Sequence, residues 1–135
     1  MILGTGADIV NIDRIAKLLA AQGDKFLQRC FTPAEQDYAA RKTDDMARAG
    51  ALAKRFAAKE ACAKALGTGI ADGISFTDIG VVHNEKGAPS LELTGAAAQR
   101  LREITPDGQS AHLHLSLSDD HPFAQAFIVI EGQQT

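Results

Sequence analysis

Hydrophobic residues recur at helical spacing through the first half of the chain, and they alternate or run together through the second half. The first apolar run, residues 2–10, contains two glycines and predicts a short strand. Behind it, helix-capping signals precede apolar positions that return every three or four residues. These patterns predict helices over residues 11–21, 26–31, 33–42 and 44–66. Thr32-Pro33-Ala34-Glu35 is a capping box, and Gly67 is placed to end the longest helix in a left-handed conformation.

The second half predicts strands with one helix among them. The strands cover residues 76–83, 90–93, 111–118 and 123–131, and Thr94 is placed to cap a helix that runs to about Ile104. The first two strands are joined through residues 84–89, a turn-rich hairpin connection. The last, FAQAFIVIE, is almost continuously apolar, which predicts a central position in the sheet. We therefore expect one α+β domain over residues 1–135, with a helix-rich first half packed on an antiparallel sheet formed mainly by the second half.

The longest predicted helix carries charges on its apolar side. Stepping about 100° per residue places Glu60 about 40° from the centre of the face around Phe56. A carboxylate there must pair, bind a cation or lose its charge, and Lys59 and Lys64 flank it. The alternative is an exposed Glu60–Lys64 pair at i and i+4, worth about 0.2–0.5 kcal/mol.

Asp8 is the second carboxylate embedded in an apolar segment of the first half. It could cap the helix that follows its strand. Its other interpretation is a metal ligand, because two carboxylates completed by water and phosphate oxygens are how magnesium is usually held beside a pyrophosphate. The sequence therefore offers Asp8 and Glu60 as a candidate magnesium pair.

Two further features could contact phosphate. The turn Gly67-Thr68-Gly69 lets backbone N–H groups approach an anion closely, although a lone GTG is more often a helix stop, and no P-loop spacing is present. His114 shares one face of its strand with His112, Ser116 and Ser118. A solvent-facing polar strand face explains that alternation as well as a phosphate contact does.

Composition narrows the class of protein. Apolar residues make up 45% and charged residues 23%, and the net charge is −3. The first 70 residues hold 11 Lys and Arg against 8 Asp and Glu, whereas the rest hold 3 against 9. This mild asymmetry lacks the basic patch of a nucleic-acid binder and suits a local docking face for an acidic or phosphorylated partner.

Location is indicated by what the chain lacks. No apolar run is as long as a membrane span, and the first residues carry no export signal. Cys30 and Cys62 lack metal or redox spacing, so we expect buried free thiols in a reducing cytoplasm.

Taken together, four segments resemble the small bacterial type of 4'-phosphopantetheinyl transferase, the holo-acyl carrier protein synthase family. They are GTGADIVNIDRI, RFAAKEACAKALGTGI, NEKGAP and HLSLSDDHPFAQAFIVIE, in the family's order and approximate spacing. The second segment, with its K-E-x-x-x-K core before A-x-G-T-G, is the most specific. Asn11 departs from the glutamate that members often carry, at a position that is not a metal ligand in the family.

The resemblance implies transfer of the phosphopantetheine arm of coenzyme A to a serine of apo-acyl carrier protein, leaving adenosine 3',5'-bisphosphate. It implies Mg²⁺ on Asp8 and Glu60, and Lys64 facing the pyrophosphate. It also implies homotrimers with active sites between subunits, and a first helix, with Arg14 and Lys17, that meets the acidic carrier. Positions near the coenzyme A phosphates are Arg55, Lys59, Gly67, Thr68, Gly69 and His114.

The chemistry is consistent with these residues. A metal neutralises charge on the pyrophosphate, and a lysine adds positive charge where negative charge develops. The acceptor serine must lose its proton to Glu60 or to a metal-bound water, between which the sequence does not decide. Two rival functions use the same residues: a pyrophosphatase acting on coenzyme A or a related nucleotide, and a binding module without turnover.

Overall fold

A 21-residue helix, α4 (Asp45–Ala65), runs through the middle of the molecule and supplies more core residues than any other element. The computed structural model describes residues 1–135. The other elements are β1 (Ile2–Asn11), α1 (Ile12–Gln22), α2 (Asp24–Cys30), α3 (Pro33–Ala40), η1 (Phe76–Asp78), β2 (Ile79–His83), β3 (Pro89–Leu93), α5 (Gly95–Ile104), β4 (Gln109–Asp120) and β5 (Phe123–Gln134). The helices α1, α2 and α3 precede α4, and η1 is a single 3-10 turn.

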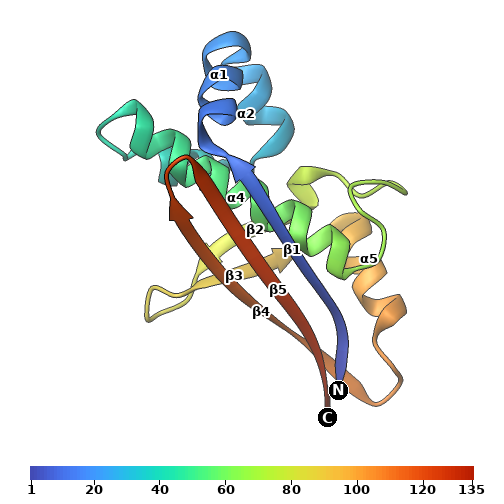
Figure 1. The fold of residues 1–135 in the computed structure, drawn as a ribbon. Coiled ribbons are helices and arrows are strands. Elements are labelled where there is room, and N and C mark those ends of the chain that lie inside the picture. The colour runs from blue at the N-terminus through green and yellow to red at the C-terminus, as the bar shows by residue number, and fades with distance from the viewer.

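The strands form two antiparallel sheets. One sheet has the order β1-β5-β4, and the other is the hairpin β2-β3. This confirms the α+β class and the central position of β5. The sequence predicted a single antiparallel sheet, whereas the structure has two. The first and last strands of the chain pair, with Asp8 opposite Ala126, so the two termini lie side by side in Figure 1.

The core lies between α4 and one face of the three-stranded sheet. Alternate residues of β5 point toward α4 and are fully buried: Ala124, Ala126, Ile128 and Ile130. Alanines dominate the buried side of α4, and their small side chains let the helix lie close to the strands. The core cluster contains 27 buried residues in all.

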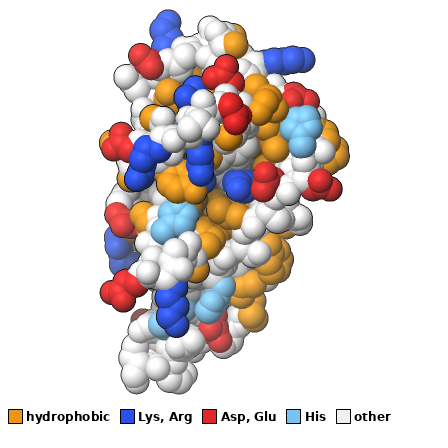
Figure 2. All heavy atoms as spheres, turned by 90° about the vertical axis from the view of Figure 1, so that its left-hand side faces the viewer, with side chains coloured by type: hydrophobic (Ala, Val, Ile, Leu, Met, Phe, Trp, Pro, Cys, Tyr) orange, Lys and Arg blue, Asp and Glu red, His pale blue; other side chains and the backbone are white.

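The opposite face of this sheet has no helix over it. Its residues alternate with the buried ones, and three large apolar side chains on it are exposed: Ile9 by 64%, Phe123 by 50% and Phe127 by 46%. Figure 2 shows hydrophobic side chains gathered along its right-hand edge, which is the side turned toward the viewer in Figure 1. We call this surface the outer sheet face.

Side-chain caps set the helix boundaries near the expected positions. Asn11 Oδ1 accepts a hydrogen bond from Asp13 N at 2.9 Å and thereby starts α1. Thr32 and Glu35 make both bonds of the predicted capping box, and Asp44 Oδ1 accepts from Ala47 N at 2.7 Å.

Two local predictions were wrong. Residues 76–78 form the 3-10 turn η1 instead of a strand, because the Asp78 carboxylate accepts a hydrogen bond from Ser75 N at 3.1 Å and holds the chain in a tight turn. Thr94 precedes α5, but its side chain makes no capping bond to that helix. None of the helices is both long and apolar enough to cross a membrane.

Candidate active site

Two glycines of β1 bring the strand unusually close to α4. Strand side chains alternate, so Gly4, Gly6 and Asp8 share the face that looks at the helix. A Cβ on Gly4 would lie 2.1 Å from the carbonyl oxygen of Ala65, and one on Gly6 would lie 1.9 Å from that of Ala61. Only glycine fits at either position, and the next residue in the same row is Asp8.

Lys64 links the helix to the strand at this point. Its Nζ donates to Asp8 Oδ1 at 3.0 Å and to the Ala7 carbonyl oxygen at 3.1 Å. The Lys64 side chain is half exposed, whereas that of Asp8 is mostly covered. A lysine ammonium has three donors, so one remains free for a further acceptor from solvent or a ligand.

Glu60 lies one turn before Lys64 and is partly buried. Burial raises the pKa of its carboxyl above the ordinary value, and the negative charge of Asp8 raises this pKa further. The positive charges of Lys64 and Arg14 act in the opposite direction. Two carboxylates that disfavour each other's charge form a site that a cation would stabilise.

The donor set fits magnesium better than a transition metal. Asp8 and Glu60 offer hard oxygen ligands, and no cluster of three or more His, Cys, Asp or Glu side chains exists anywhere in the molecule. Mg²⁺ is characteristically held by one or two carboxylates, with water and phosphate oxygens completing its shell. A hollow of about 320 Å³ opens beside Asp8, and Lys64, Ile9 and Gln125 also line it.

The predicted carrier-binding residues lie near this group. Arg14 and Lys17 are exposed and stand three residues apart on α1, which places them on one side of that helix. The Arg14 guanidinium lies 5.9 Å from the centroid of the Phe56 ring, and its positive charge acts to lower the pKa of the Glu60 carboxyl. The structure therefore brings together Asp8, Glu60, Lys64 and Arg14.

The glycine turn is engaged with the helix that it ends. Gly67 N donates to Lys64 O, while Thr68 N and Gly69 N both donate to Ala63 O at 3.2 and 3.1 Å. Gly67 and Gly69 have positive φ angles of 83° and 66°, which confirms the left-handed terminator. All three N–H groups already donate within the chain in this geometry, and a phosphate contact by this turn stays a prediction.

Lys59 is also placed differently from the expectation. Its side chain is fully buried, and its Nζ lies 2.6 Å from Glu35 Oε1, so it presents no surface to a phosphate. Burial lowers the pKa of this ammonium, and the charge of Glu35 opposes that change. The resemblance suggested a ligand contact, but within this chain Lys59 is a core residue.

Arg55 and His114 lie apart from the two carboxylates. The Arg55 guanidinium stacks over the Tyr38 ring at 3.9 Å from its centroid, and its Nε has no hydrogen-bond partner although it is buried. His114 lies exposed on the outer sheet face, with Nε2 3.0 Å from Glu131 Oε1. A single chain therefore does not assemble all of the predicted phosphate contacts.

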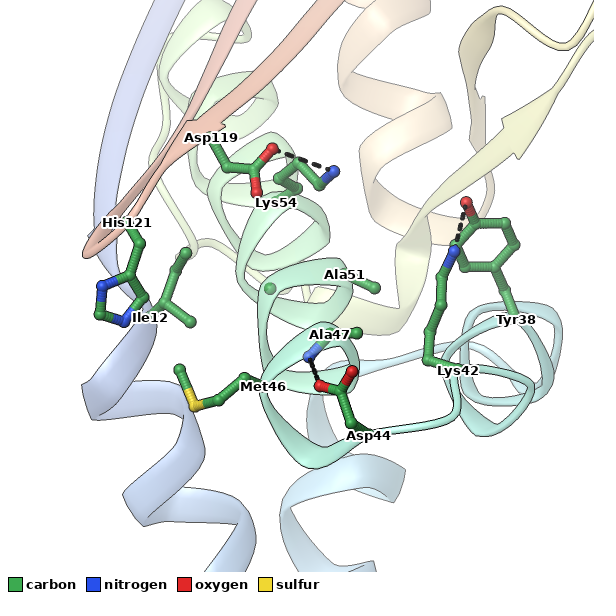
Figure 3. A pocket seen from close by; sticks show the side chains of 11 residues that line it. Ile12, Tyr38, Lys42, Asp44, Met46, Ala47, Ala51, Lys54, Asp119 and His121 are labelled. Carbon is green, nitrogen blue, oxygen red and sulfur yellow. Dashed lines mark hydrogen bonds and ion pairs between the residues drawn. The ribbon is translucent and has the colours of Figure 1, made fainter.

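A larger hollow of about 460 Å³ lies elsewhere, between the start of α4, the segment before it and the β4–β5 turn (Figure 3). Its polar side chains point across it and are partly paired: Lys54 Nζ lies 3.4 Å from Asp119 Oδ1, and Lys42 Nζ lies 3.5 Å from the Tyr38 hydroxyl. Neither carboxylate of the candidate metal pair lines it, so its size alone does not make it the site of the chemistry.

Sequence reasoning missed the roles of Gly4, Gly6 and Glu35. Glycines two residues apart in a strand are a recognised signal of close backbone approach, and here that signal was available. Glu35 was interpreted only as a capping residue. Its second partner stands 24 residues further along the chain, and no local pattern indicates it.

The chain matches known proteins over nearly its whole length. The family model for the 4'-phosphopantetheinyl transferase superfamily matches residues 4–126. A holo-[acyl-carrier-protein] synthase of Cereibacter sphaeroides is 56% identical over 133 residues, 98% of this chain and 95% of the relative. The protein of the same name from Phenylobacterium zucineum is 54% identical over 98% of this chain and 94% of the relative.

Solved structures agree. The holo-[acyl-carrier-protein] synthase of Neisseria meningitidis is 40% identical with a TM-score of 0.81, covering 97% of this chain and 99% of the other. That of Helicobacter pylori, solved in complex with coenzyme A, is 34% identical with a TM-score of 0.77, covering 94% and 99%.

Proposed function

The chain belongs to the 4'-phosphopantetheinyl transferase superfamily, and from that premise we propose that it transfers the 4'-phosphopantetheine group of coenzyme A to a serine of apo-acyl carrier protein. The observation that carries the proposal is the grouping of Asp8, Glu60 and Lys64 where β1 meets α4. Adenosine 3',5'-bisphosphate is the second product.

Asp8 and Glu60 would hold a magnesium ion. When bound, the ion neutralises negative charge on the pyrophosphate and on the departing bisphosphate. The glycine-enforced approach of β1 to α4 keeps the two carboxylates near each other before any ligand arrives. The raised pKa of Glu60 supports this assignment, because the pair is unfavourable while it lacks a cation.

Lys64 would face the pyrophosphate. Two of its donors hold Asp8 and the Ala7 carbonyl, and the third can donate to a phosphate oxygen. The serine oxygen forms a bond to the β-phosphorus as the bond from that phosphorus to the bisphosphate oxygen breaks. A fixed ammonium close to that centre stabilises the charge that builds on the phosphate oxygens.

The serine proton leaves during this attack. Glu60 has a raised pKa, so it is a stronger base than an ordinary glutamate. Glu60 and a water molecule are the two candidate acceptors. Arg14 and Lys17, exposed beside the site, would meet the acidic surface of the carrier.

A homotrimer with interfacial sites would complete the coenzyme A site. The outer sheet face exposes Ile9, Phe123 and Phe127 with no element over them, and an exposed apolar sheet face of this kind is typical of an interface between chains. His114 lies on that face, and the buried, unpaired Nε of Arg55 lies in another part of the chain. A neighbouring subunit could bring His114, which is exposed, to the carboxylates of the first.

A cytoplasmic location is part of the proposal. Cys30 and Cys62 are both buried free thiols, which are most common in proteins of a reducing compartment.

Intact mass spectrometry tests the activity directly. Apo-acyl carrier protein is incubated with this protein, coenzyme A and Mg²⁺, and parallel reactions omit the metal or use a carrier whose acceptor serine is alanine. A gain of one phosphopantetheine, absent from both parallel reactions, is the expected result. Consumption of coenzyme A with an unmodified carrier would indicate the pyrophosphatase, and no change in either would indicate a binding module.

Glu60→Ala tests the metal pair. We expect this variant to fold and to retain less than about a tenth of the wild-type turnover, since removing one charged ligand or base commonly costs about 10²–10⁴-fold. Circular dichroism is the control for folding. Activity above that limit would contradict the assignment of Glu60.

A further inference from the structure

The core of this protein contains one fully buried ion pair, Glu35 with Lys59, which joins four elements. Both side chains have zero exposure, and Lys59 Nζ lies 2.6 Å from Glu35 Oε1. Glu35 belongs to α3 and Lys59 to α4, while the remaining partners come from η1 and β2 and from the cap of α3.

Every donor of Lys59 and both carboxylate oxygens of Glu35 are engaged in hydrogen bonds. The Lys59 ammonium donates to Glu35, to Phe76 O at 3.0 Å and to Ile79 O, which accounts for its three donors. The Glu35 carboxylate also accepts from Thr32 N and from Val81 N, both at 2.9 Å. If one of the two side chains were replaced by an uncharged one, the charge of the other would be buried without a compensating partner.

Stability alone does not account for such a pair. Buried ion pairs can generally be replaced by apolar side chains of similar volume without loss of stability, because desolvation offsets the attraction between the charges. Apolar contacts, however, have no direction, whereas these five bonds define one rotation and one depth for the middle of α4.

The residue that follows Lys59 is Glu60. Adjacent positions on a helix differ by about 100° in direction, so a rotation of α4 that disturbs Lys59 turns Glu60 by the same angle. Asp8 lies on β1, a different element, and it is tied to α4 through Lys64, whose Nζ lies 3.0 Å from Asp8 Oδ1. The placement of Glu60 relative to Asp8 therefore depends on how α4 is rotated.

We propose that Glu35 and Lys59 are positioning residues of the transferase site: their buried pair fixes the rotation of α4 so that Glu60 faces Asp8. The inference rests on the proposed function. Neither residue contacts substrate or metal. Their effect on turnover is exerted through the placement of Glu60.

The decisive variant is Glu35→Leu/Lys59→Met, which replaces the pair by apolar side chains of similar size. We expect this variant to melt below the wild type, because the backbone groups Thr32 N, Val81 N, Phe76 O and Ile79 O lose their buried partners. Turnover and metal affinity are therefore compared below its melting temperature. The turnover number kcat should fall at least about 10-fold, in the range of about 10–100-fold seen when groups behind a metal ligand are lost. KM for the carrier should change less than about threefold, because Arg14 and Lys17 lie on another helix.

A second readout does not depend on turnover. Mn²⁺, used alone as a probe, reports metal affinity through the relaxation of water protons, and the variant should bind it about 10–100-fold more weakly than the wild type. Arg48→Met is the matched control: it removes a cation from the same helix whose pair with Asp45 is exposed, and it should leave kcat and Mn²⁺ affinity unchanged.

A stable double variant with wild-type kcat and Mn²⁺ affinity would overturn the proposal, since a merely structural pair predicts that result. If the double variant fails to fold, Glu35→Gln takes its place below its melting temperature, with the same criteria. If the wild type itself transfers nothing, the proposed function fails, and the Mn²⁺ comparison alone decides whether the pair positions the carboxylates.

Discussion

Gly6→Ala is the substitution that most directly tests how the active site is held together. A Cβ at this position would lie 1.9 Å from the carbonyl oxygen of Ala61, whereas an ordinary contact begins at 3.4 Å. The obstruction is backbone, so no side chain can rotate away. β1 and α4 must therefore separate by about 1.5 Å at this level, and Asp8 would move away from Glu60.

The expected cost is large for activity and moderate for stability. A displacement of about 1 Å in a catalytic arrangement can cost about 10²-fold in rate, so we expect kcat to fall at least that far. Overpacking a well-filled core typically costs about 1–3 kcal/mol, and contact with backbone should place this variant at the upper end. The Mg²⁺ concentration for half-maximal rate should rise as well.

The assay is the initial rate of carrier modification by mass spectrometry, with a Mg²⁺ titration and a thermal melt of the same samples. Gly50→Ala is the matched control. A Cβ at Gly50 meets only Asp119 Oδ2 at 3.9 Å, and exchanging glycine for alanine inside a helix stabilises by up to about 1 kcal/mol. If Gly6→Ala keeps kcat within about threefold of the wild type, the close approach does not position the carboxylates and the reasoning fails.

Three further predictions concern Glu60, the outer sheet face and the two cysteines. The folded pKa of Glu60 is raised, so its favourable contribution to stability is full below the ordinary glutamate pKa and is lost as the pH rises through the folded pKa. Without metal, Glu60→Gln should therefore melt above the wild type at neutral pH. Mg²⁺ at 100 times its dissociation constant should stabilise the wild type by about 2.7 kcal/mol, and the variant by less. A variant that melts lower in differential scanning calorimetry would contradict this. Phe127→Asp should dissociate the proposed homotrimer in sedimentation experiments, since it places a charge on the outer sheet face. A trimer that forms in both the wild type and this variant would exclude that face as the interface. Burial raises the pKa of Cys62 to about 12 and also raises that of Cys30. Iodoacetamide at mildly alkaline pH should therefore label both thiols only as fast as the protein unfolds. Rapid labelling of the native protein would refute their burial.

The sequence alone determined most of the helices and strands, and it supplied the candidate site residues. Capping side chains act on amides within three residues, so the starts of α1, α3 and α4 could be located without knowledge of the fold. A carboxylate on the apolar side of a helix has few explanations, and for Glu60 that pattern indicated the part of the molecule where the structure places Asp8 and Lys64 as well. The motif resemblance added the family and the reaction.

The tertiary structure decided which lysine faces the site and what brings the carboxylates together. Lys59 and Lys64 both flank Glu60 in the sequence, yet one is buried against Glu35 and the other reaches Asp8. That difference depends on α3, β1 and β2, which are separate elements that contact α4. Hydrophobic periodicity records which face of a helix is buried, but it does not record which neighbour buries it, and the electrostatic role of a charged side chain follows from the neighbour.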